Sequence, residues 1–381
     1  MKVLIVTGIF PPDIGGPATY VPVIGGELVR QGHEVMVVTL SDELSHDDRG
    51  YPFHVVRLRR GLSKLLRFIL TVLTLLRWGR QADLLFVNRL SLEVLAANIF
   101  LRKPLVQKVV GDWAWERATN KGWVKESFEE FQRGKHGLKV EALKALRNLC
   151  VHRTNKIIVP SRYLARWAAS SWGVPEEKIT VIYNAVEPLN GIQPAEVSLQ
   201  TRVKIVTVGR LVPWKQVDQI IEALARCDGV GLVIIGDGPE RGHLEELVRT
   251  LDLRDRVYFA GARSKAETLS LMAACDLFVL NSTYEGFPHV VLEAMSLGLP
   301  VVATAVGGTP EVVEDEENGL LLAPATNGAL SETLLQLVSS PLERQRLANG
   351  AKHTMERFRL SAMVEKTEAV LRNSAHLQGR R

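Results

Sequence analysis

The chain has 381 residues, of which 46% are hydrophobic and 23% are charged, and its formal net charge is +5. This length exceeds one ordinary domain and predicts two, while the composition excludes a disordered or low-complexity chain. No uninterrupted apolar stretch reaches the ~18 residues of a membrane span, and the three widely separated cysteines fit a reducing compartment and offer no disulfide framework or metal knuckle.

The charge is unevenly distributed along the chain. Residues 1–188 carry 27 lysines and arginines against 18 carboxylates, a surplus of +9, whereas residues 189–381 carry 20 against 24. We therefore expect two halves with different partners, although two solvated surfaces without functional meaning would give the same counts.

The first half of the sequence predicts alternating strands and helices. An apolar strand at residues 3–6 is followed by a loop rich in glycine and proline, a helical pattern that stops at Gly32, and a second strand at 34–40. Further strands are expected at 84–87, 105–110 and 156–160. Their apolar runs lack polar alternation, which is typical of a parallel sheet covered on both faces.

A basic cluster surrounds an apolar helical stretch in this half. Residues 57–80 contain seven cations around an apolar run at 65–76. That run is roughly 18 Å of helix and cannot cross a ~30 Å hydrocarbon core. Either the helix packs on the first-domain sheet, or its basic flanks meet an anionic membrane surface. The polar, glycine-punctuated segment 121–144 is expected to be a loop or lid.

The second half repeats the alternation and predicts a second doubly wound α/β domain. Strands are expected at 203–208, 231–235, 257–259, 277–280, 301–304 and 320–322. Helices are expected near 215–226, 239–251, 264–274, 288–297, 309–314 and 326–338. The chain should end in a helical stretch at about 341–373.

Turn-forming residues near 185–200 indicate the join between the two domains. We predict an N-terminal domain at 1–188, a C-terminal domain at 189–357, and a final helix at about 358–373 that could pack back on the first domain. In doubly wound sheets, ligands bind beyond the carboxyl ends of the strands. The residues that follow each strand are therefore the candidates for chemistry.

Two strand ends in the second half carry charged residues. After strand 203–208 come Gly209, Arg210 and Lys215, and these two cations suit a diphosphate. After strand 277–280, Glu285 lies on a loop and Glu293 in the second turn of the next helix. Carboxylates accept hydrogen bonds from sugar hydroxyls, and free amides at a helix start suit phosphate oxygens. The competing interpretation is that the two cations are exposed surface residues and the two acids are ordinary loop and helix residues.

These residues resemble a known family. Arg210 with Lys215, and Glu285 followed by seven residues and Glu293, resemble the donor site of the retaining glycosyltransferases of family 4. Segments 298–304 and 306–311 continue that pattern, and the amino-terminal Phe10-Pro11-Pro12 with Gly15-Gly16 also matches it. The resemblance implies the GT-B fold, in which two Rossmann-like parallel-sheet domains face each other across a cleft.

The resemblance also implies a nucleotide diphosphate sugar as co-substrate, with UDP-sugars favoured over GDP-sugars and with no bound cofactor or metal. Arg210 and Lys215 would hold the diphosphate, Glu285 the donor sugar and Glu293 the ribose hydroxyls. Further donor contacts are implied for Gly15, Gly16, Gly209, Gly286, Phe287 and His289.

The sequence departs from the family pattern in three places. Lys215 is followed by Gln216 where many members have glycine, and His289 stands where many have asparagine. Many members also carry a histidine after the strand equivalent to 105–110, where this chain has Gly111-Asp112-Trp113-Ala114-Trp115-Glu116. Asp112 or Glu116 could orient the acceptor instead. Alternatively, Trp113 and Trp115 line an acceptor groove and the acids are structural.

Together these features favour a retaining glycosyltransferase with a glycan or lipid-linked acceptor, in cell-surface polysaccharide or glycolipid synthesis. We expect it in the cytoplasm, with peripheral contact to the inner face of the plasma membrane. A nucleotide-sugar epimerase of the same fold and a non-catalytic basic binding protein are the alternatives. Nucleic acid is not an expected partner because aromatic and basic residues do not interleave. No Gly-x-Gly-x-x-Gly follows the first strand, which argues against a dinucleotide oxidoreductase.

Overall fold

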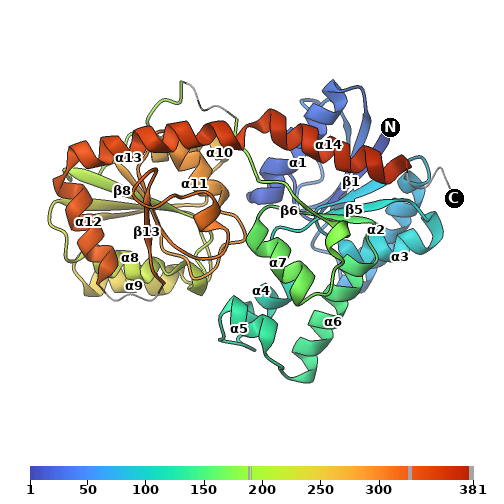
Figure 1. Ribbon diagram of the computed structural model, residues 1–381, viewed down its shortest axis with the longest axis horizontal. Coiled ribbons are helices and arrows are strands. Elements are labelled where there is room, and N and C mark those ends of the chain that lie inside the picture. The colour runs from blue at the N-terminus through green and yellow to red at the C-terminus, as the bar shows by residue number, and fades with distance from the viewer. Residues whose placement is uncertain (188, 190, 325–327, 377–381) are drawn as a thin grey trace. The chain divides into compact units, whose positions relative to one another are not determined.

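The computed structural model describes the chain except residues 188, 190, 325–327 and 377–381 (Figure 1). It contains two compact units: unit 1 comprises Met1–Tyr183 and the segment that begins at Ser361, and unit 2 comprises Asn184–Leu360. The sequence placed the join after residue 188, and the structure places it between Tyr183 and Asn184. Each unit has a parallel sheet flanked by helices, so the predicted pair of doubly wound, Rossmann-like domains is confirmed.

The described residues of unit 1 form a seven-stranded sheet in the order β3-β2-β1-β4-β5-β6-β7, and neighbouring strands run parallel. The strands are β1 (Lys2–Thr7), β2 (Glu34–Ser41), β3 (His54–Arg59), β4 (Leu84–Val87), β5 (Leu105–Lys108), β6 (Lys156–Val159) and β7 (Ile179–Val181). The chain builds outward from β1 in one direction and then in the other. The reversal between β1 and β4 is the switch point at which such sheets leave a crevice for ligands.

Helices pack on this sheet through apolar faces. They are α1 (Gly16–Arg30), α2 (Lys64–Gly79), α3 (Ser91–Leu101), α4 (Trp113–Asn120), α5 (Phe128–Arg133), α6 (Leu138–His152), α7 (Arg162–Ser170) and α14 (Leu360–His376). Leu75 of α2 and Val94 of α3 join Leu4 and Leu85 of the sheet in one buried cluster. One face of α2 is therefore packed on unit 1, as one of the two interpretations of residues 57–80 required.

Helix α14 returns to unit 1 through a buried polar contact. His33 follows α1 and is only 7% exposed. Its Nε2 lies 2.7 Å from Oε1 of Glu368 in α14. The contact joins residues 335 positions apart in the sequence. Burial raises the pKa of Glu368, but the hydrogen bonds from His33 and Arg372 outweigh it and leave that pKa below its ordinary value.

The prediction of a loop or lid at 121–144 is wrong, because α5 and the first half of α6 lie in this segment. Ser127 and Glu130 form a reciprocal capping box at the start of α5. Phe128 and Phe131, three residues apart, place their rings on the buried side of that short helix. The charges conceal this pattern in the sequence, since the helix exposes its acids and buries two aromatic rings.

The described residues of unit 2 form a six-stranded parallel sheet in the order β10-β9-β8-β11-β12-β13. The strands are β8 (Val203–Val208), β9 (Val230–Ile235), β10 (Val257–Gly261), β11 (Leu277–Leu280), β12 (Val301–Thr304) and β13 (Leu320–Leu322). The α-helices are α8 (Val217–Leu224), α9 (Arg241–Thr250), α10 (Lys265–Ala273), α11 (His289–Ser296), α12 (Ala329–Ser339) and α13 (Pro341–Thr354). Four strands, β8, β11, β12 and β13, have the predicted bounds.

Two predicted helices differ from the structure. The helix expected at 309–314 is a single 3₁₀ turn, Thr309–Glu311, after which the backbone turns away. The helix expected at 341–373 is interrupted, since α13 is followed by a 3₁₀ turn, Met355–Phe358, before α14 begins. That turn lies where the chain passes from unit 2 to unit 1. The sequence also missed β3, whose arginines suggested only a basic cluster, and β7, which has three residues.

Among the helices in the described part of the chain, none combines the length and the apolar character needed to cross a bilayer.

Candidate functional site

The switch point of the unit 2 sheet lies between β8 and β11. The loops that leave the carboxyl ends of these strands contain Arg210 with Lys215, and Glu285. A backbone hydrogen bond ties the two loops together, because Thr283 N donates to the carbonyl oxygen of Trp214 at 2.8 Å. The fold therefore brings together side chains that are 70 positions apart in the sequence.

Lys215 and Glu285 form a close ion pair at this point. The Lys215 Nζ lies 2.5 Å from Glu285 Oε1, and Ser282 Oγ donates to the same oxygen at 2.6 Å. Both side chains are mostly buried, at 18% and 11% exposure. Low exposure weakens screening by water, so the hydroxyl positions the carboxylate and the carboxylate holds the lysine head group in one position.

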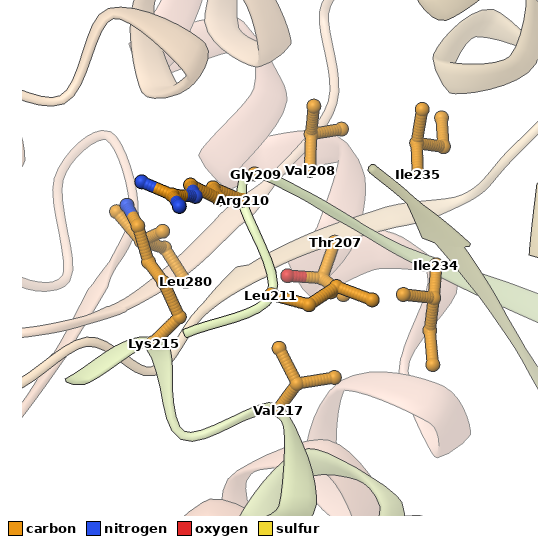
Figure 2. A pocket seen from close by; sticks show the side chains of 10 residues that line it. All are labelled: Thr207, Val208, Gly209, Arg210, Leu211, Lys215, Val217, Ile234, Ile235 and Leu280. Carbon is orange, nitrogen blue, oxygen red and sulfur yellow. The ribbon is translucent and has the colours of Figure 1, made fainter. Parts of the chain in front are cut away.

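Arg210 supplies a second positive charge beside this pair. Figure 2 shows the head groups of Arg210 and Lys215 on the same side of the small pocket that they help to line. Arg210 is exposed, and no ion pair engages it among the described residues. Two cations with one carboxylate leave a surplus of one positive charge, which suits an anionic ligand.

Two glycines set the positions of these loops. A Cβ on Gly307 would lie 1.8 Å from the carbonyl oxygen of Glu285, and Gly307 has a φ of +59°. A Cβ on Gly236 would lie 1.9 Å from the carbonyl oxygen of Gly209. The neighbouring Gly308 N also donates to the Glu285 carbonyl at 2.9 Å. The loops after β8, β9, β11 and β12 are thus in backbone contact, which fixes where Glu285 stands.

Glu293 lies in α11 and is 6% exposed. Its Oε1 lies 3.1 Å from His289 Nδ1 and also pairs with Lys265 of α10. Burial raises the pKa of Glu293, but the hydrogen bond from His289 and the charge of Lys265 outweigh it, so the net pKa lies below its ordinary value. Glu293 is therefore a charged carboxylate near neutral pH. The sequence pattern did not single out Lys265, because nothing in the spacing links α10 to α11.

The other predicted donor residues of unit 2 lie around this centre. Gly209 lines the same small pocket as Arg210 and Lys215. Gly286 and Phe287 are buried in the loop that leads to α11, and the ring of Phe287 packs 5.9 Å from that of Phe358. The pocket itself has a volume of about 10 Å³. That is room for about one water molecule, so a ligand of these cations would lie on their exposed side.

The predicted residues of the first half lie in unit 1. Gly15 precedes α1 with a φ of +146°, and Gly16 is the first residue of that helix. Asp112 is fully buried: its Oδ1 accepts from the amides of Ala114 and Trp115 at the start of α4, and its Oδ2 from Gln132 and Arg147. This carboxylate is engaged within unit 1, which favours the interpretation that Asp112 is structural.

Trp115 and Glu116 differ in their surroundings. Trp115 is 2% exposed and packs edge-on against Phe128, so it is part of the core. Glu116 and Trp113 line a cavity of about 510 Å³ whose lining residues all belong to unit 1. This cavity lies at the carboxyl ends of β1, β4 and β5, and therefore at the switch point of the first sheet. Of the three predicted acceptor-side residues, only Glu116 reaches it.

No group of three or more histidine, cysteine or acidic side chains is placed to hold a metal ion within the described residues. The three cysteines are buried and unpaired, and burial raises the pKa of Cys275 to about 12. A thiol with so high a pKa stays protonated at neutral pH and is a poor nucleophile.

Two family models match the chain. Residues 14–188 match the model described as Glycosyltransferase Family 4, and residues 192–354 match the model described as Glycosyl transferases group 1.

Among curated proteins, an uncharacterized glycosyltransferase of Methanocaldococcus jannaschii is 26% identical over the full length of both chains. The lipopolysaccharide core biosynthesis glycosyltransferase LpsE of Rhizobium meliloti is 36% identical over 40% of this chain and 44% of its own. Among solved structures, Anabaena HepE in complex with UDP and glucose aligns with a TM-score of 0.79 at 22% identity, over 98% of this chain and 100% of that one. WaaG, a glycosyltransferase involved in lipopolysaccharide biosynthesis, aligns with a TM-score of 0.74 at 20% identity, over 97% and 99%.

Proposed function

We propose that this chain, whose two halves match the family 4 and group 1 glycosyltransferase models, moves a sugar from a nucleotide diphosphate sugar to an acceptor with retention of the anomeric configuration. The observation that carries this proposal is the Lys215–Glu285 pair beside the unpaired Arg210 at the switch point of unit 2. A leaving diphosphate develops negative charge as the bond to the sugar breaks, and cations held in place beforehand stabilise that charge without reorganising.

The two cations divide this work. Arg210 offers a planar fork that matches two oxygens of one phosphate, and Lys215 offers a point charge held by Glu285. In the reaction, the bond from the anomeric carbon to the diphosphate oxygen breaks while the acceptor oxygen bonds to that carbon on the same face. The acceptor proton passes to an oxygen of the leaving diphosphate. No carboxylate nucleophile is needed on this route, and the role of Glu285 is to position Lys215 and the donor sugar.

The remaining donor contacts follow from the geometry around α11. Glu293 uses Oε1 for Lys265 and His289, so its Oε2 is the atom for the ribose hydroxyls. Gly286, Phe287 and His289 stand between Glu285 and Glu293 and would contact the donor through the backbone. Gly15 and Gly16 remain part of the proposal as backbone contacts from unit 1.

A UDP-sugar is the favoured donor. Support comes from HepE, which shares this fold and whose structure was solved with UDP and with UDP-glucose. Relatives in lipopolysaccharide core synthesis support a glycan or lipid-linked acceptor in cell-surface polysaccharide or glycolipid assembly. We propose that this reaction takes place in the cytoplasm.

We also propose that residues 57–80 contact an anionic membrane. The outer side of α2 leaves Leu65 71% exposed and Leu73 56% exposed, and Phe100 of the adjoining α3 is 75% exposed. Lys64 and Arg77 are exposed at the two ends of α2. An apolar strip flanked by cations is the pattern of a helix that lies in the headgroup region.

Membrane contact is tested by sedimentation with vesicles of phosphatidylcholine with and without phosphatidylglycerol. The wild type should sediment with the anionic vesicles, and Leu65→Ser with Leu73→Ser should not. Leu138→Ser, at a leucine that is 92% exposed elsewhere on unit 1, is the matched control. Equal sedimentation of all three proteins would contradict the proposal.

The proposed reaction is tested by incubating the protein with UDP-glucose and following UDP release and product structure. The anomeric proton coupling of the product, measured by NMR, should report an α linkage from the α-linked donor. A β linkage would contradict retention. Formation of an epimerised UDP-sugar without acceptor would instead indicate the epimerase alternative.

A further inference from the structure

The cavity of about 510 Å³ in unit 1 is lined by an unusual buried lysine. Lys108 ends β5, is 2% exposed and lines this cavity. Its Nζ has no hydrogen-bond partner and lies over the ring of Tyr20, 4.0 Å from the ring centroid. A buried ammonium without a partner costs folding free energy, so such a group is retained where a ligand can use it.

A second polar atom beside it is also unsatisfied. Asn88 follows β4, is 5% exposed, and its Oδ1 has no partner. Asn88 and Lys108 thus stand at the ends of two neighbouring strands, and both line the cavity. Native structures satisfy most buried polar groups, so two orphans in one cavity indicate a polar ligand.

Among the charged residues that line the cavity, cations outnumber acids. Arg89 and Arg117 line the cavity without an ion pair to any described residue, and the side chain of Arg67 donates to the carbonyl oxygen of Arg60. Arg60 itself is engaged by Asp13 and Asp42. Two carboxylates, Glu93 and Glu116, also line the cavity. Four cations without a carboxylate partner therefore outnumber the two acids, which favours an anion.

The backbone adds donors to the same cavity. Helix α3 begins beside it, since Leu90, Ser91, Leu92 and Glu93 are lining residues. No side chain caps this end, and Leu90 precedes it in the left-handed conformation with a φ of 63°. The first amides of a helix point outward and carry partial positive charge, so they bind phosphate oxygens. The left-handed conformation is strained for a leucine, and Leu90 adopts it because the chain must turn sharply into the start of α3.

We propose that this cavity binds the acceptor through a phosphate ester, with Arg89, Lys108 and the start of α3 as the donors to the phosphate oxygens. Asn88 and Glu93 then face the hydroxyls of the same molecule. This assignment of the acceptor class rests on the proposed glycosyl transfer, whereas the anion site itself does not. The volume suits a phosphorylated sugar or polyol, or the head group of a phospholipid.

The test is calorimetric titration of the full chain at constant ionic strength with glycerol 3-phosphate, with dihexanoyl phosphatidic acid below its micelle concentration, and with glycerol. Both phosphates should bind and glycerol should not. A higher affinity for the phosphatidic acid indicates a lipid-borne phosphate, and equal affinities indicate a water-soluble one. Failure of both phosphates to bind overturns the proposal.

Variants separate this cavity from the donor site. Arg89→Ser with Lys108→Met should weaken glycerol 3-phosphate binding roughly tenfold or more and leave UDP binding unchanged. Arg153→Ala removes an exposed unit 1 arginine that does not line the cavity, and it should bind like the wild type. If Arg210→Ala with Lys215→Ala abolishes phosphate binding while the Arg89 and Lys108 variant keeps it, the anion binds unit 2 and the proposal fails. If the wild type binds glycerol 3-phosphate but does not bind UDP, that result contradicts the proposed function and leaves the anion site standing.

Discussion

The two switch points of this molecule are built in opposite ways. In unit 2, Lys215 is held by Glu285, whose carboxylate also accepts a hydrogen bond from Ser282, and the adjoining pocket has a volume of about 10 Å³. In unit 1, Lys108 is buried without a hydrogen-bond partner beside a cavity of about 510 Å³. A paired cation on loops that contact each other is held ready to bind an anion and costs the fold little free energy. An unpaired buried cation lowers stability until a ligand arrives.

The largest effect should come from breaking the ion pair of unit 2. Lys215→Ala removes a held positive charge, and the turnover of UDP-glucose should fall by roughly 10²–10³-fold, as for loss of one oxyanion donor in other enzymes. Arg202→Ala, an exposed arginine before β8, is the control and should keep wild-type rates. Initial rates of UDP release measure both. If Lys215→Ala turns over UDP-glucose within about twofold of the wild-type rate, Lys215 does not stabilise the leaving diphosphate.

The next largest effect should come from the backbone contacts that hold Glu285. Gly307→Ala would place a methyl group where the Glu285 carbonyl oxygen stands, so the free energy of unfolding should fall by about 3 kcal/mol or more. Gly242→Ala is the matched control, because it lies in α9 with nothing within 4 Å of an added Cβ. It should gain up to about 1 kcal/mol. Urea unfolding compares them, and equal stabilities would refute the close contact.

Replacing the buried lysine of unit 1 should raise the free energy of unfolding, whereas Gly307→Ala should lower it. Burial lowers the pKa of Lys108 to about 7, so between pH 7 and its ordinary value the unfolded chain binds more protons than the folded one. Lys108→Met should therefore be the more stable protein near pH 7, by on the order of 2 kcal/mol. The difference should shrink as the pH rises toward 10, because the unfolded lysine then loses its proton as well. A wild type more stable than the variant at pH 7 would contradict this account.

The smallest effect should come from removing metal ions. Arg210 and Lys215 supply the positive charge that a divalent cation supplies to a diphosphate in other sites. Incubation with EDTA followed by desalting should therefore leave the rate of transfer unchanged. A rate that falls with EDTA and returns with Mg²⁺ or Mn²⁺ would show that the two cations do not suffice.

The sequence predicted the parts of this molecule that depend on local pattern. Apolar runs located β8, β11, β12 and β13, and the strand ends located Lys215 and Glu285, because loops after parallel strands meet at one edge of the sheet. The sequence pattern did not reveal α5, because the surrounding charges hid its capping box at Ser127 and Glu130 and its two buried rings.

What the sequence could not predict depends on long-range contacts. Nothing in the spacing joins Lys265 to Glu293, or His33 to Glu368. Asp112 resembled an acceptor-side acid until Arg147 and Gln132 were found on its carboxylate. The sequence pattern did not single out Lys108, and only the fold shows that its head group is buried without a hydrogen-bond partner.

The central claim is that the paired cations of unit 2 bind the nucleotide diphosphate of the donor. Calorimetric titration of UDP into the wild type and into Arg210→Ala with Lys215→Ala tests it most directly. The account predicts binding by the wild type and a loss of about 100-fold or more in affinity for the double variant, which is about 2.7 kcal/mol. Equal affinities in the two proteins would contradict it.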